Sequence, residues 1–193
     1  MATPAQRTNT WTLDEWYDQA VAGTTGGYTG AGQLYTLGRN NHGELGQNTR
    51  SPGASGAYSS PVQVPGNFTL TTYGDNGTVH AIKADNTLWA WGDNEYGQLG
   101  LNDFGTGGPG PEYSSPTQVP GSWSTICSGA YNGQALAVKT NGTLWAWGYA
   151  GRGQDGLNGT KGNGAPEGAQ GPRLSSPTQV GTDTTWSASG TGD

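Results

Sequence analysis

The chain has 193 residues, of which 36 are glycine and only 11% are charged, and its aromatic side chains are mainly tryptophan (8) and tyrosine (9). This balance is typical of a turn-rich all-β protein and argues against both a helical protein and a disordered one. The net charge of −6, with scattered lysines and arginines, excludes a basic face for nucleic acid, and no apolar run reaches the roughly 18 to 20 residues of a membrane span.

The first predicted element is a short helix within residues 1–33, which lie outside the repeats. Thr12 begins a Thr-Leu-Asp-Glu capping box, and Gly23 stands where a C-cap is expected. Such a short helix is marginal alone in water, so its apolar side chains must be buried, either on the protein's own first repeat or on a partner. Residues 24–32 resemble a flexible hinge. The predicted partner-anchoring residues are Trp11, Leu13, Trp16, Tyr17 and Val21.

Residues 34–193 form the predicted second domain, a body built from repeats of about 55 residues. The phrase Leu-Trp-Ala-Trp-Gly and its weaker copy Leu-Tyr-Thr-Leu-Gly end at Gly38, Gly92 and Gly148. A second phrase, Ser-Ser-Pro-x-Gln-Val, occurs in step with the first, at Pro61, Pro116 and Pro177. Two independent markers with one period indicate a supersecondary unit that is stacked several times.

Each unit contains a predicted β-hairpin, with Ala-Asp-Asn-Thr as the link within residues 78–92 and Thr-Asn-Gly-Thr within residues 135–147. Strand alternation places the two tryptophans of a hairpin on one face, where we expect packing between repeats; the alternative is a stacking platform for sugars or bases. A loop with the pattern Gly-x-Asn-x-x-Gly-[Gln/Glu]-Leu-Gly follows, and its leucine is expected to plug the core. The predicted repeat-packing residues are Trp89, Trp91, Trp145, Trp147, Leu45 and Leu99.

The compound motif of these loops, Ser-Ser-Pro phrases and hairpins resembles the repeat of the regulator-of-chromosome-condensation family over residues 34–180. The resemblance implies a β-propeller of four-stranded blades used for protein interaction, and sometimes for nucleotide exchange or light sensing. The copies are too few to close a ring, so we expect an all-β partial β-propeller of about three blades with a short N-terminal helix. In the last loop Ala150 and Asp155 replace the motif's Asn and Leu, and we expect that loop to be re-aimed and solvated.

No catalytic, metal or cofactor site is predicted. His42 and His80 have no ligand-spaced neighbours, so we expect each to be a loop or surface residue. The single Cys127 excludes an internal disulfide, fits folding in a reducing cytoplasm, and is expected to be a small buried apolar residue. No calcium-loop spacing, phosphate-binding loop or secretory signal is visible. We therefore expect a protein that is not an enzyme.

A helical tether, a hinge and a repeat body form the layout of an attachment protein, and the strand edges of incomplete blades invite pairing with another chain. Short proteins with such repeats resemble virion proteins of tailed bacteriophages, particularly of marine hosts. That resemblance implies a capsid decoration or a tail or fibre subunit, located in the virion, whose partners are other virion proteins or copies of itself. The alternatives are a soluble propeller-type interaction adaptor and a carbohydrate-binding receptor protein with a glycan as partner. Neither nucleic acid nor a membrane is expected as a partner.

Overall fold

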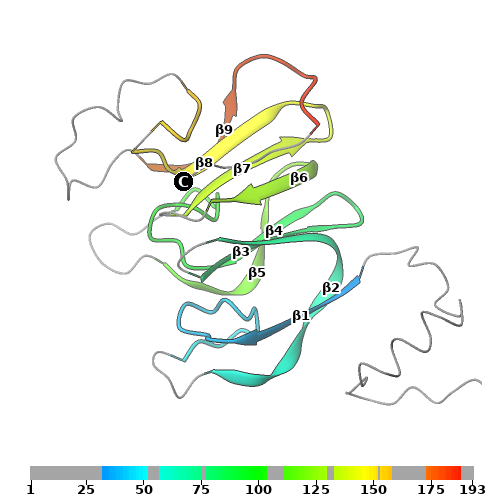
Figure 1. Ribbon diagram of the computed structural model, residues 1–193, viewed down its shortest axis with the longest axis vertical. Coiled ribbons are helices and arrows are strands. Elements are labelled where there is room, and N and C mark those ends of the chain that lie inside the picture. Colours follow the sequence, from blue (N-terminus) through cyan, green and yellow to red (C-terminus); the bar gives the residue numbers. More distant parts are fainter. Residues whose placement is uncertain are drawn as a thin grey trace, which may run out of the picture. The chain divides into compact units, whose positions relative to one another are not determined.

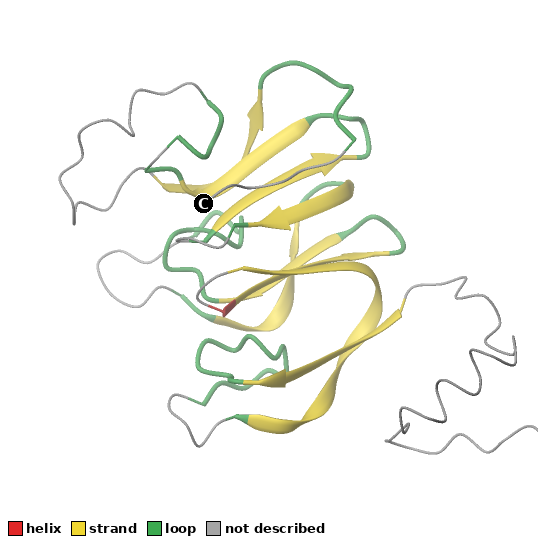
Figure 2. Cartoon of the chain, viewed as in Figure 1, coloured by secondary structure: helices red, strands yellow, loops and turns green. Residues whose placement is uncertain are grey.

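The computed structural model describes most of the repeat body, where β-strands joined by loops form two sheets (Figure 1, Figure 2). The described residues are 32–51, 57–74, 77–103, 111–129, 133–151, 153–157 and 173–187. The predicted helix lies outside them, and so do its anchoring residues Trp11, Leu13, Trp16, Tyr17 and Val21.

Both sheets are antiparallel throughout. The first contains, in spatial order, β1 (Gly32–Gly38), β2 (Tyr58–Gly74), β3 (Thr78–Lys83), β4 (Leu88–Gly92) and β5 (Tyr113–Val119). The second contains β6 (Trp123–Ser128), β7 (Gln134–Lys139), β8 (Leu144–Tyr149) and β9 (Arg173–Val180). Spatial order follows chain order, as expected when each strand folds back on its predecessor.

The long strand β2 belongs to two repeats. Residues 58–68 pair with β1, whereas residues 68–74 pair with β3. Gly66 lies near the changeover with a φ of 139°, which glycine adopts readily because it has no Cβ. We therefore define blade 1 as β1 with the first half of β2, blade 2 as the second half of β2 with β3, β4 and β5, and blade 3 as β6 to β9. The described residues thus hold two four-stranded blades and two strands of another, close to the three blades that were predicted.

The predicted hairpins are confirmed. Strand β3 pairs with β4, and β7 pairs with β8, in the same register. In both links an Asx side chain closes the turn: Oδ1 of Asp85 accepts a hydrogen bond from the N–H of Thr87 at 3.0 Å, and Oδ1 of Asn141 accepts one from the N–H of Thr143 at 3.2 Å. Each turn is therefore held by a side chain of the turn itself, as its sequence predicted.

Apolar side chains fill the space between successive blades, and β6 of blade 3 packs against β2 and β3. The junction of blades 1 and 2 contains Val64, Phe68, Val79, Ala81 and Trp91. The junction of blades 2 and 3 contains Ile82, Leu88, Ala90, Leu99, Val119, Trp123, Ile126, Ala135, Ala137 and Trp147. Within each hairpin, alanines on one strand pair with tryptophans on the other. The small alanines let neighbouring sheets approach closely, and the large rings fill the remaining volume.

Residues 181–187 begin like a further repeat but contain no strand. The N–H of Trp186 donates to the carbonyl of Gly142 at 3.2 Å, just as the N–H of Trp123 donates to the carbonyl of Asn86 at 2.8 Å. Trp123 is fully buried at the junction of blades 2 and 3, whereas Trp186 is 44% exposed. The two residues thus have equivalent backbone hydrogen bonds, but only Trp123 is buried by neighbouring strands.

Candidate functional site

The glycine loops are held by a buried asparagine. In the loop after β4, Oδ1 of Asn94 accepts a hydrogen bond from the N–H of Leu99 at 3.0 Å, and its Nδ2 donates to the carbonyl of Asp103 at 2.9 Å. Asn40 makes the same pair of bonds in the loop after β1, where Leu45 is the leucine. Both leucines are buried. The asparagine therefore fixes the loop so that its leucine enters the core.

The loop after β8 keeps the form of the others despite its divergent sequence, so the expectation that it is re-aimed is wrong. The N–H of Gly156 donates to the carbonyl of Gly153 at 3.2 Å, and their φ angles of 64° and 79° are close to those of the equivalent glycines after β4. Asp155 is half-buried, and its Oδ1 accepts a hydrogen bond from the N–H of Leu157 at 3.3 Å. Ala150 is buried. The carboxylate thus meets solvent without any change in the loop.

The last tryptophan of each hairpin joins one blade to the previous one. Trp91 and Trp147 are buried. The indole N–H of Trp91 donates to the carbonyl of Glu44 at 2.9 Å, and that of Trp147 donates to the carbonyl of Gln98 at 2.8 Å. Both acceptors lie in the glycine loop of the preceding blade. These two rings therefore pack between repeats and offer no surface to a ligand.

The first tryptophan of each hairpin lies at the rim of its blade and is half-buried. The ammonium of Lys83 lies 3.7 Å from the ring centroid of Trp89, and that of Lys139 lies 3.5 Å from the ring centroid of Trp145. A cation over an indole face is attracted by the ring's quadrupole. Because these faces carry a lysine, an open stacking platform for a sugar, the alternative considered above, is not favoured.

A buried histidine connects blades 2 and 3, contrary to the expectation of a loop or surface residue. Nδ1 of His80 lies 2.8 Å from Oγ of Ser128, and its Nε2 lies 3.0 Å from the carbonyl oxygen of Gln98. A carbonyl can only accept, so Nε2 carries the proton and Nδ1 accepts from the serine hydroxyl. Burial lowers the pKa of His80 to about 4. The sequence signal for this site was a polar residue in the middle of the apolar run of β3.

The histidine belongs to a larger buried polar network. The carbonyl of Gln98 accepts from both His80 and Trp147, while the side-chain Nε2 of Gln98 donates to Oδ2 of Asp93 at 2.8 Å. Burial raises the pKa of Asp93. The backbone carbonyl of Gln98 thus joins groups from two blades. Its side chain is satisfied within its own loop, by Asp93 and by the N–H of Tyr96, whose hydrogen bond Oε1 accepts at 2.7 Å, and this explains a polar side chain at a fully buried position.

His42 lies in the loop after β1, as expected, whereas Cys127 differs from its prediction. His42 is half-buried, with its Nδ1 2.8 Å from Oε1 of Glu112, and Arg50 pairs with the same carboxylate. This cluster joins the loop after β1 to the residues before β5. Cys127 lies on β6 and is only partly buried, so the expectation of a buried apolar residue is wrong. In the ranges that the structure covers, no group of three or more His, Cys, Asp or Glu side chains is placed to hold a metal ion.

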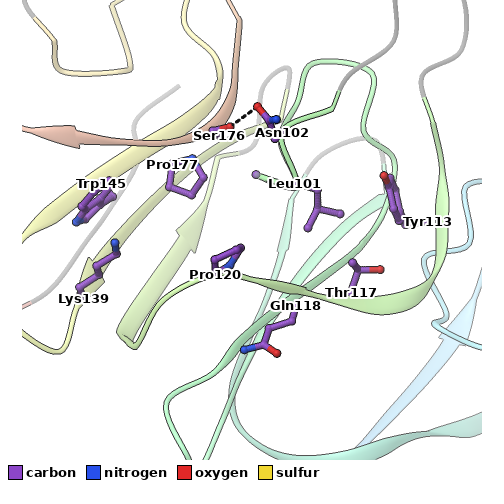
Figure 3. A pocket seen from close by; sticks show the side chains of 11 residues that line it. Leu101, Asn102, Tyr113, Thr117, Gln118, Pro120, Lys139, Trp145, Ser176 and Pro177 are labelled. Carbon is purple, nitrogen blue, oxygen red and sulfur yellow. Dashed lines mark hydrogen bonds between the residues drawn. The ribbon is translucent and has the colours of Figure 1, made fainter.

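A groove of about 450 Å³ opens at the rim between blades 2 and 3 (Figure 3). One wall comes from blade 2, with Tyr113, Thr117, Gln118 and Pro120. The other comes from blade 3, with Lys139, Trp145, Ser176 and Pro177. Gly100, Leu101 and Asn102 of the glycine loop complete the lining, and Ser176 Oγ donates to Oδ1 of Asn102 at 2.9 Å. Sequence reasoning placed Trp145 in the packing set but missed the groove, whose walls are far apart in the chain.

The sequence matches known repeats. A family model described as the regulator of chromosome condensation (RCC1) repeat matches residues 31–80 and 85–136, which is more than half of the chain. The E3 ubiquitin-protein ligase HERC2 of Homo sapiens and that of Mus musculus are each 33% identical to this chain over 98 residues, or 49% of its length. The chain corresponds to only 2% of either relative. No helix of the described residues is long and apolar enough to cross a membrane.

Solved structures share the fold. Human WBSCR16 matches with a TM-score of 0.55 at 22% identity. Yeast RCC1 (Prp20), in a structure with Kap60, matches with a TM-score of 0.61 at 17% identity, and Prp20p from Saccharomyces cerevisiae matches with 0.60 at 16%. Each comparison covers 79% of this chain and about a third of the solved chain. These likenesses confirm the predicted all-β partial propeller with repeats of this type.

Proposed function

Because the chain belongs to the regulator of chromosome condensation (RCC1) repeat family, we propose that it is a non-enzymatic module for protein interaction. The polar side chains that could take part in catalysis stabilise the fold instead. Both ring nitrogens of His80 are engaged within the junction of blades 2 and 3, and Asp93 is engaged by Gln98. The repeats therefore act as a rigid support, and the function lies on their surface.

The observation that carries this proposal is an exposed apolar face on β1. Tyr35 is 50% exposed and Leu37 is 59% exposed. Their counterparts one repeat later are Trp89 and Trp91, and Trp91 is fully buried against the preceding blade. A face that serves as a packing surface elsewhere in the same molecule is thus open on blade 1. Contiguous exposed apolar surface is one mark of a protein-interaction site, and in this proposal a partner protein covers the face of Tyr35 and Leu37.

Structural relatives support an interaction role through their own partners. Yeast RCC1 (Prp20) has been solved with Kap60 bound, and the Prp20p structure is described together with binding to Gsp1p and histones. The chain spans about a third of these proteins, so their particular partners are not transferred to it. What we carry over as part of the proposal is the use of a repeat body to bind protein.

Replacing Leu37 tests this proposal. We expect the chain to be recovered, after mild cross-linking in its native setting, in a complex larger than its own 19.9 kDa, and Leu37→Ser to weaken that complex about tenfold or more. Leu70→Ser is the matched control, since Leu70 is also exposed but lies on blade 2. Recovery at the monomer mass without any partner, or equal effects of the two substitutions, would contradict the proposal.

A narrower form of the proposal makes the chain a structural subunit of a tailed-bacteriophage virion, either a capsid decoration or a tail or fibre component. Residues 1–33 would anchor it and the repeat body would be displayed. The layout of the sequence and the open face on β1 support this form. Mass spectrometry of purified particles should find the chain in a fixed copy number, and deletion of residues 1–23 should remove it. Recovery only from the host cytosol would refute the virion assignment and leave the soluble adaptor.

A further inference from the structure

The rim groove between blades 2 and 3 has the size and lining of a binding site. Its volume of about 450 Å³ lies within the common range for ligand pockets. Apolar surface comes from Leu101, Pro120, Trp145 and Pro177, while side-chain amides come from Gln118 and Asn102. Such a mixture is typical of ligand sites, in which apolar surface contributes contact area and a few polar groups fix the orientation of the ligand.

Among the described residues that line the groove, the cation is Lys139, whose ammonium lies 3.5 Å from the ring centroid of Trp145 and 5.0 Å from that of Trp123. In the described part of the chain the ion pairs join His42 and Arg50 to Glu112, and none includes Lys139. Lys139 is partly buried, and this burial lowers the pKa of its ammonium. A partly desolvated ammonium without a carboxylate is complementary to an anionic group on a ligand.

One wall of the groove is also the outermost strand of its sheet. Strand β5 pairs with β4 on one side, and no described strand pairs with its other side, although the carbonyl of Ser114 near its start accepts from the N–H of Asn48. Thr117 and Gln118 line the groove from this strand, between Pro116 and Pro120. The backbone groups of such an edge can pair with an extended peptide, which adds a strand and directs alternate side chains into neighbouring pockets.

We propose that this groove binds an extended peptide segment of a partner protein, with an acidic side chain of that peptide at Lys139 and its backbone along β5. Apolar neighbours of the acidic residue lie on Trp145, Pro120 and Pro177. The inference rests on the proposed interaction function and names the chemistry of the partner. It concerns a surface different from the face of Tyr35 and Leu37, so the two can fail separately.

Blade 2 supplies a matched control. Lys83 lies over Trp89 as Lys139 lies over Trp145, at 3.7 Å against 3.5 Å, and both lysines precede the turn of a hairpin. Lys83 does not line the groove. Lys83→Gln therefore removes the same charge from the same kind of pair without altering the proposed site.

Fluorescence anisotropy on the full chain tests the proposal. The probes are labelled nonapeptides that share a central glutamate and vary in their flanking residues, each compared with the same peptide carrying glutamine. We expect glutamate peptides with β-branched or proline neighbours to bind about tenfold more tightly than their glutamine versions. Lys139→Gln should abolish this preference, whereas Lys139→Arg and Lys83→Gln should retain it.

Three results with these peptides and variants would overturn the proposal. These are absence of binding across the peptide set, a preference for glutamate that survives Lys139→Gln, and equal losses in Lys139→Gln and Lys83→Gln. Equal binding of N-acetylglutamate alone would also overturn it, because the site would then hold a free carboxylate and no peptide. Thermal unfolding of each variant shows whether it is folded under the binding conditions, so a loss of binding can be distinguished from a loss of folding. None of these outcomes depends on the complex tested with Leu37→Ser.

Discussion

Acidification should weaken the junction between blades 2 and 3 through His80. Burial lowers the pKa of this histidine from 6.5 to about 4. At pH 7 its ring is neutral, with Nε2 bonded to the carbonyl of Gln98 and Nδ1 to the hydroxyl of Ser128. In the unfolded chain this histidine has its ordinary pKa of 6.5, so unfolding takes up a proton between pH 6.5 and 4. The folded state therefore loses stability as the pH falls through that window.

The two pKa values set the size of the effect. Each unit of difference between the folded and unfolded pKa values corresponds to about 1.4 kcal/mol, and the two values here are about 4 and 6.5. The free energy of unfolding is therefore lower by about 3 kcal/mol near pH 4, and the effect vanishes above pH 7. Asp93, the nearby carboxyl whose pKa is raised by burial, acts in the opposite direction, because its protonation favours the folded state as the pH falls. A comparison that keeps Asp93 unchanged isolates the histidine.

Urea unfolding of the wild type and of His80→Gln at pH 7 and pH 4.5 provides that comparison. The amide of glutamine offers a donor for the carbonyl of Gln98 and an acceptor for Ser128 but does not titrate. We expect the wild type to lose about 2–3 kcal/mol more than the variant between the two pH values. Since only the pH-dependent difference is used, a lower stability of the variant at pH 7 does not affect the test. Equal losses would refute the assignment of His80 as a buried neutral group.

Two further predictions concern the packing between blades. Gly97→Ala places a Cβ 2.7 Å from Cα of Ser175 at a φ of +77°, whereas Gly153→Ala, at a φ of +79°, meets no atom within 4 Å. Urea unfolding should show that Gly97→Ala lowers the free energy of unfolding by more than about 2 kcal/mol and Gly153→Ala by about 1 kcal/mol. Equal losses would contradict the tight contact at Gly97. Trp147→Phe keeps an aromatic ring but leaves the carbonyl of Gln98 without the indole donor, so about 1–2 kcal/mol should be lost. A change below about 0.5 kcal/mol would show that this bond does not stabilise the junction.

The hairpins and loops could be predicted because their signals act over a few residues. Asp85 and Asn141 close their turns through bonds to residues only two positions away. The asparagine of the glycine loop bonds to the leucine five positions later, so the motif itself contains both partners. The loop after β8 was misjudged because the prediction weighed the side chain of Asp155, whereas the backbone bonds and φ angles of Gly153 and Gly156 match those of the other loops.

The groups at the blade junctions could not be placed in the same way. His80 reaches Gln98 and Ser128, which lie 18 and 48 positions away, and nothing in its neighbourhood along the chain specifies either one. The exposure of Cys127 likewise depends on which segments cover β6. For the tryptophans, alternation put both rings of a hairpin on one face, but only the packing of the preceding blade made Trp91 buried and left Trp89 half-exposed at the rim.

The sequence by itself determined the repeat, its period, the strands and their turns, since each of these follows from residues that are close together in the chain. Tertiary structure alone decided that His80 would be neutral, that Lys139 would lie over Trp145, and that β5 would form one wall of a groove. The physical reason is that burial and charge pairing depend on the distance between residues in space. In stacked repeats that distance is set by contacts between one unit and the next.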